Sequence, residues 1–193
     1  YNQALIEARI SNRQYEICHQ GTGGQFKKSH YNNCLNVPDA SYLVEPINGL
    51  WLLAIDANVY VPLNDVIAVD ETDNPRKFSG SGNAGYNKMF SHKAHVISWI
   101  ESVVNRANMA GKKLIAFSHF PMTEFYDQQS NDIAKTFGSK NFQLARRPHD
   151  SVSRSLSALG LKIHVGGHMH INDTGVIRNK RGGFLFNIQA PSI

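Results

Sequence analysis

Hydrophobic and polar positions divide this chain into short apolar runs, which are typical of buried strands, and longer amphipathic segments, which are typical of helices. The runs that predict strands are residues 41–45, 50–55, 114–117, 161–165, 174–178 and 184–188. Apolar residues recur at helical spacing in residues 1–17, before Gly111 and before Gly160. The alternation of helix and strand in the second half of the chain predicts an α/β fold with a mixed sheet and flanking helices.

Cap and stop residues set the limits of the two later helices. Ser91 is predicted to cap the first of them and Asp150 the second, because short polar side chains satisfy the free amide groups at a helix start. Gly111 and Gly160 are predicted to end these helices, because glycine readily adopts the left-handed conformation found there.

Three stretches without a clear period, 18–40, 59–90 and 122–147, are predicted to be long loops, the last with a short helix. Asn48-Gly49, between the first two strands, is typical of a tight hairpin turn. Since the strand pattern resumes after each loop, residues 1–193 are expected to form a single domain.

The composition is that of an ordinary globular chain with a mild positive charge. Hydrophobic residues make up 41% and charged residues 18% of 193 positions, and no apolar run is long enough to span a membrane, so no membrane partner is expected. The formal net charge is +5, and the basic residues come in scattered pairs. This pattern, without interleaved aromatic residues, argues against a nucleic-acid partner and is compatible with an anionic small-molecule substrate.

Two cysteines, Cys18 and Cys34, leave three interpretations open. Two thiols are the default, and a disulfide would form in an oxidising compartment. A metal knuckle with His19 and His30 would have a spacing that fits structural zinc sites poorly.

Polar residues follow three of the predicted strands. Residues 56–58 (Asp-Ala-Asn), His119, and the pair His168 and His170 each come directly after an apolar run. The carboxyl ends of parallel strands meet at one edge of a sheet, so these side chains are expected to converge there. Neutral imidazoles are common metal ligands, and the three histidines therefore indicate a metal site.

Two motifs carry a family resemblance. The segment 112–121, Lys-Lys-Leu-Ile-Ala-Phe-Ser-His-Phe-Pro, resembles the fourth conserved block of calcineurin-like metallophosphoesterases. The segment 167–170, Gly-His-Met-His, resembles their fifth block, Gly-His-x-His. The order and spacing of the surrounding elements match the family over roughly residues 41–190.

The resemblance implies a four-layer α/β/β/α sandwich and a site for two divalent metal ions, manganese, iron or zinc. By position, His119 and His168 would bind one ion and His170 the other. Such a pair of ions clamps the phosphoryl oxygens and generates a hydroxide nucleophile at neutral pH. The implied activity is hydrolysis of a phosphomonoester or phosphodiester, and no side chain is assigned as a general acid or base.

The family's earlier blocks, Asp-x-His, Gly-Asp-x-x-Asp/Asn and Gly-Asn-His-Asp/Glu, are absent from this chain. The chain is therefore expected to be the C-terminal portion of a metallophosphoesterase domain, inactive alone and with few or no ions bound. A catalytically inactive binding or regulatory module with the same fold is the alternative. Incomplete sheets expose an edge, so self-association is also expected. Substrate-contact candidates lie in the two later loops: Tyr86, Phe125, Tyr126, Arg146 and Arg147.

Overall fold

The computed structural model describes residues 2–18, 39–59 and 85–191, which form an α/β structure around a seven-stranded mixed sheet. The strands are β1 (Tyr15–Ile17), β2 (Tyr42–Ile47), β3 (Leu50–Ala54), β4 (Lys113–Ser118), β5 (Ile163–Gly166), β6 (Asp173–Arg178) and β7 (Phe184–Gln189). The helices are α1 (Asn2–Ile10), η5 (Tyr86–Lys88), α3 (Met89–His92), α4 (Ala94–Met109), α5 (Ser130–Phe137), η6 (Leu144–Arg146) and α6 (Asp150–Ala158).

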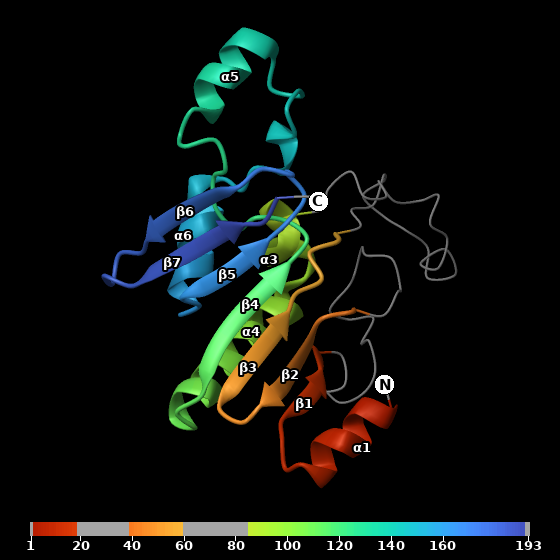
Figure 1. Ribbon diagram of the computed structural model, residues 1–193. Coiled ribbons are helices and arrows are strands. Elements are labelled where there is room, and N and C mark those ends of the chain that lie inside the picture. Colours follow the sequence, from red (N-terminus) through yellow and green to blue (C-terminus); the bar gives the residue numbers. More distant parts are fainter. Residues whose placement is uncertain (1, 19–38, 60–84, 192–193) are drawn as a thin grey trace, which may run out of the picture.

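The strands are ordered β1-β2-β3-β4-β5-β7-β6 (Figure 1). β3, β4, β5 and β7 run parallel, and antiparallel hairpins flank them on both sides. The predicted neighbours β4 and β5 are paired directly, with Ser118 opposite Gly166. The carboxyl ends of the strands that carry His119 and His168 therefore lie together at one edge of the sheet.

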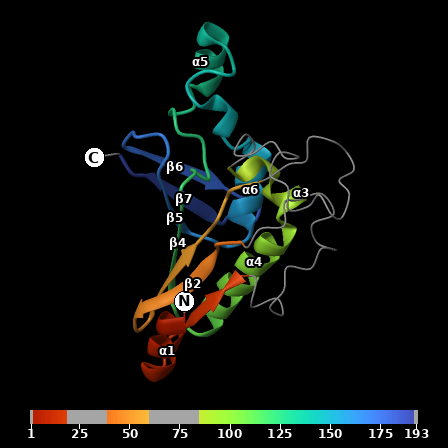
Figure 2. The same ribbon diagram turned by 90° about the vertical axis from the view of Figure 1, so that its right-hand side faces the viewer.

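Helices α3, α4 and α6 cover one face of the sheet (Figure 2). α4 packs through a broad apolar stripe, and Trp99, Ile100 and Val103 on it are buried. Facing them from the sheet are the buried residues Leu43, Trp51, Leu53 and Ala116. None of the described helices is long and apolar enough to cross a membrane.

The opposite face carries apolar side chains that remain exposed in the described part of the chain. Phe186 on β7 is 45% exposed, and Val176, its partner on β6, is 54% exposed. Ile163 on β5 and Ile188 on β7 extend the same apolar strip. The run 50–55 is apolar throughout, which is typical of a strand covered on both faces, but Leu52, on the face opposite the helices, stays half-buried.

The helix predicted over residues 1–17 is shorter in the structure. α1 ends at Ile10, and Asn12, with φ of 53°, turns the chain into β1. Glu16 on β1 accepts hydrogen bonds from Trp99 Nε1 at 2.5 Å and from both terminal nitrogens of Arg106. Pairing with β2 and this contact to α4 outweigh the weak helical pattern of residues 15–17.

The predicted caps of the two later helices differ from the structure. Ser91 lies inside α3, and Lys93 is the N-cap residue of α4. Asp150 is the first residue of α6, with His149 at the N-cap position. Neither N-cap makes a side-chain hydrogen bond, so tertiary packing sets these starts.

The predicted hairpin at Asn48-Gly49 is confirmed, with β2 and β3 joined there. Within the predicted loop 59–90, residues 86–92 are helical, and residues 60–84 lie outside the described part. Residues 19–38 of the first predicted loop, including Cys34, also lie outside it. The third loop contains α5 and η6, as its expected short helix indicates.

Gly111 and Gly160 follow α4 and α6 in the left-handed region, with φ of 63° and 93°. A β-carbon on Gly160 would lie 3.0 Å from Val104 Cγ1, whereas one on Gly111 would meet nothing within 4 Å. We expect Gly111→Ala to lower the free energy of unfolding by about 1 kcal/mol through backbone strain alone. Gly160→Ala should lower it further because of the added crowding. Urea unfolding of both variants measures the difference, and equal losses would contradict it.

Candidate functional site

Two glycines bring the ends of β4 and β5 into close contact. Gly167 N donates a hydrogen bond to His119 O at 3.0 Å, which joins the two strand tips directly. A β-carbon on Gly166 would lie 3.2 Å from Pro121 Cα, so a larger residue would push the tips apart. The absence of a side chain at these positions therefore permits the close approach of the two strand ends.

His119 and His168 face each other across this junction. His168 Nδ1 lies 3.0 Å from His119 Nε2, and the ring centroids are 4.9 Å apart. The buried Phe120 ring packs against both imidazoles, with centroid distances of 4.8 and 4.7 Å. The structure thus brings together two of the three histidines that the sequence singles out.

His168 and His170 both have left-handed backbone conformations, with φ of 72° and 55°. A residue with a β-carbon adopts this region at a cost of about 1–2 kcal/mol, and such conformations concentrate at functional sites. His170 is exposed, and its charge lowers the pKa of His168. In the described residues, no group of three or more His, Cys, Asp or Glu side chains gathers closely enough to hold a metal ion.

Gln143 holds the His168 ring from the other side. Its Oε1 lies 3.2 Å from His168 Nε2 and serves as acceptor for the Nε2 proton. The lone pair of neutral His168 then sits on Nδ1, the atom that faces His119. Gln143 itself has a left-handed φ of 57°, and no local sequence signal identifies it as a partner of His168.

The pKa of His168 lies below its usual value. Partial burial is the main cause, and the positive charges of His119, Arg146 and His170 add to it. The imidazole is therefore neutral at neutral pH, which is the form that binds metal ions.

The histidine pair fits two ligands of one metal ion. Imidazole nitrogens that bind a common ion at about 2.0–2.1 Å lie roughly 3 Å apart. The 3.0 Å separation of His168 Nδ1 and His119 Nε2 matches this spacing. An acceptor on the remote nitrogen, here Gln143 Oε1, is the usual orienting partner of a metal-binding histidine.

A buried polar chain supports β4 just before His119. Tyr86 OH donates to Ser118 Oγ at 2.8 Å, and Ser118 Oγ lies 2.9 Å from His164 Nε2. His164 Nδ1 lies 2.7 Å from Asn187 Oδ1, which also accepts from Met122 N at 2.9 Å. Asn187 Oδ1 is thus an acceptor, so His164 carries its proton on Nδ1 and accepts at Nε2.

His164 lies inside the apolar run of β5, a place typical of a core histidine, and it is fully buried. Burial lowers its pKa to about 4, although the hydrogen bond with Asn187 acts in the opposite direction. Burial also raises the pKa of Tyr86, which keeps its proton for Ser118. Sequence patterns find His164 itself but not its three partners, which come from other elements.

The polar tip after β3 has a different role from the histidines. Asp56 Oδ1 accepts from Asn58 N and Nδ2 at 3.0 and 2.8 Å. Lys93 Nζ donates to Asp56 O at 2.5 Å and pairs with Asp39 at 2.5 Å. These groups satisfy one another, so Asp56 and Asn58 close the end of β3 and do not join the histidine pair.

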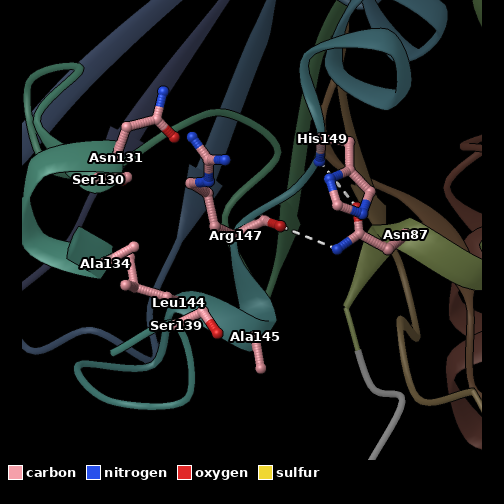
Figure 3. Close-up of a pocket in the computed structure, with 9 residues that line it drawn as sticks. All are labelled: Asn87, Ser130, Asn131, Ala134, Ser139, Leu144, Ala145, Arg147 and His149. Atoms are coloured by element: carbon pink, nitrogen blue, oxygen red, sulfur yellow. Dashed lines mark hydrogen bonds between the residues drawn. The ribbon is translucent and has the colours of Figure 1, made fainter. Parts of the chain in front are cut away.

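The five substrate-contact candidates divide by burial. Tyr86 and Phe125 are buried and face the core, not a substrate. Tyr126 is half-buried and its hydroxyl donates to Phe142 O at 2.8 Å. Arg146 lies close enough to lower the pKa of His168, and Arg147 lines a pocket beside η6 (Figure 3).

Comparison with models of known protein families finds no match to this chain. No curated protein matches it either.

The buried state of His164 generates a pH prediction. From about pH 6.5, the usual pKa of histidine, down to about 4, the unfolded chain binds a proton that folded His164 does not. The free energy of unfolding should therefore fall by up to about 1.4 kcal/mol per pH unit as the pH is lowered through this window. His164→Gln should reduce this slope, whereas the exposed His149→Gln should not. Urea unfolding between about pH 4 and 6.5 measures the slope of the unfolding free energy against pH. Identical slopes in all three proteins would contradict the prediction.

Proposed function

We propose that this chain carries the histidine part of the dinuclear site of a calcineurin-like metallophosphoesterase, which hydrolyses a phosphomonoester or phosphodiester. The observation that carries the proposal is the 3.0 Å contact between His168 Nδ1 and His119 Nε2 at the ends of neighbouring parallel strands. The motifs Ser-His-Phe-Pro and Gly-His-x-His supply these two side chains in the family order. A phosphate-ester small molecule is the proposed substrate.

In this proposal His119 and His168 hold one divalent ion, and His170 holds the second. Bound ions of this kind supply charge stabilisation to phosphoryl oxygens and activate water for attack. The protein's own contribution is to keep the imidazoles neutral and aligned. Phe120 packs against the pair, and Gln143 directs the lone pair of His168 toward His119.

Manganese, iron and zinc all bind imidazole, so the proposal leaves the metal open among these three. Three imidazoles leave the charge of two divalent ions unbalanced, because neutral ligands carry no negative charge. Carboxylates normally supply that balance and bridge the ions. Residues 1–193 alone are therefore proposed to bind ions weakly and to be inactive.

Metal binding tests the assignment directly. We expect His168→Ala to abolish binding of Mn²⁺ or Zn²⁺ to the chain and Gln143→Ala to weaken it about tenfold, because loss of an orienting partner costs about 10- to 100-fold in affinity. Isothermal titration calorimetry measures both, and His149→Ala, at an exposed histidine away from the pair, is the matched control.

Undiminished binding in His168→Ala would overturn the proposed ligand set. Assays with p-nitrophenyl phosphate and added manganese should find negligible turnover by residues 1–193. Robust metal-dependent turnover that disappears in His168→Ala would contradict the proposed inactivity while supporting the site. Absence of any metal binding would favour the alternative, a binding or regulatory module with this fold.

We also propose the finer architecture, in which the sheet is one of two in a four-layer sandwich. The exposed strip of Ile163, Val176, Phe186 and Ile188 supports this, because a second sheet packs through such side chains. Without that layer, the strip and the edge strand β6 favour association between copies of the chain.

Phe186→Glu, in the exposed strip, should therefore reduce self-association. Met109→Glu, at an exposed position on the helical side, should leave it unchanged. Light scattering over a concentration series measures both variants, and a clean monomer for the unmodified chain at high concentration would contradict the proposal.

A further inference from the structure

A pocket of about 340 Å³ lies between α5, η6 and the start of α6 (Figure 3). Its polar lining includes Arg147, His149, Asn131 and Ser139. Leu144 and other small apolar groups complete the wall, and no acidic residue is among the described residues that line it. The pocket therefore combines one fixed positive charge, neutral hydrogen-bonding groups and a short apolar wall.

The Arg147 guanidinium is available for a ligand. Arg147 is half-buried, and its side chain makes no hydrogen bond or ion pair with the residues that the structure describes. In Figure 3 it points toward the side-chain amide of Asn131, on the opposite wall of the pocket. A partly desolvated guanidinium without a carboxylate partner is a strong site for an anion.

Arg147 also lines a neighbouring pocket that contains the carboxylates of Glu124, Asp127, Asp150 and Asp173, and two of these have other partners. Glu124 accepts from the backbone amides of Tyr126 and Gln128 at 3.0 and 2.7 Å. Asp150, at the start of α6, pairs with Arg154 at 3.6 Å. Among the described residues, none of the four pairs with the Arg147 guanidinium.

Hydrogen bonds that do not involve its side chain hold the backbone of Arg147. Asn87, on η5, donates from Nδ2 to Arg147 O at 2.8 Å and accepts from His149 N at 2.8 Å (Figure 3). The two contacts clamp the chain on both sides of Pro148, and they use backbone atoms only at positions 147 and 149. A substitution of the Arg147 side chain therefore leaves the clamp intact.

We propose that this pocket binds an oxyanion, namely a phosphate or carboxylate group of a small ligand. The Arg147 guanidinium is the bidentate hydrogen-bond donor to that oxyanion. Leu144, in the pocket wall, directly follows Gln143 in the chain, and Gln143 Oε1 lies 3.2 Å from His168 Nε2. Because both sites draw residues from this one segment, we assign to the pocket a second, non-reacting anionic group of the substrate. That last role rests on the proposed function, whereas oxyanion binding by the pocket does not.

Titration with inorganic phosphate in the presence of a chelator tests the pocket separately from any metal site. The probe signals are the Arg147 side-chain N–H and the His149 ring, followed by NMR. Phosphate should shift both signals, and Arg147→Gln should weaken binding about tenfold or more, since hydrogen bonds to charged groups are the strong ones. Arg147→Lys should weaken it less, because the charge remains while the fork geometry is lost.

Arg178→Gln is the matched control, because it removes the same charge from an exposed position on β6 and should bind phosphate as the unmodified chain does. Far-ultraviolet circular dichroism and urea midpoints check that all variants fold. A parallel titration with acetate identifies which oxyanion class the pocket prefers, and saturable binding of either through Arg147 supports the inference.

Absence of both phosphate and acetate binding with chelator, or binding that is unchanged in Arg147→Gln, would overturn the inference. Binding that requires added Mn²⁺ and is lost only in His168→Ala would overturn the pocket while supporting the proposed metal site. Binding that persists with chelator and requires Arg147 would support the pocket even if no metal binds to the histidines.

Discussion

The close parallel pairing of β4 and β5 at their carboxyl ends is the constraint on which the candidate site depends. The hydrogen bond from Gly167 N to His119 O joins the tips, and a β-carbon at Gly166 would crowd Pro121. His119 and His168 meet because their strands meet. Side-chain positions fixed by paired strands are more exact than positions on free loops, which suits groups that must share one ligand.

Beneath these tips, the sheet contains a buried polar chain where an apolar core is usual. Hydrogen-bond contacts link Tyr86, Ser118, His164 and Asn187, and each of the four belongs to a different element. Such a network favours one arrangement of the strands and helices, because a shift of one element against another leaves a buried polar group without a hydrogen-bond partner. It passes through Ser118, the residue before His119, so the buried network and the candidate site are joined by one peptide bond.

The long segment after β4 connects the histidine pair with the neighbouring pocket. Gln143 contacts His168 from this segment, and Arg147 lines the pocket four residues later. Asn87 fixes the segment from the far side through the backbone at residues 147 and 149. The metal candidates are thus carried by the sheet, whereas the groups suited to reach the rest of a ligand are carried by a loop that the sheet and α6 position.

The sequence by itself determined the strand and helix pattern, the glycines at the strand tip and the convergence of His119 with His168, because these follow from local periodicity and from the geometry of parallel strands. It placed residues 15–17 in a helix, since pairing with β2 is a long-range contact that local spacing does not record. The orientation of His168 by Gln143, the partners of His164 and the unpaired guanidinium of Arg147 were decided only by the tertiary structure. Each depends on which distant residues meet in space, and no local pattern encodes that.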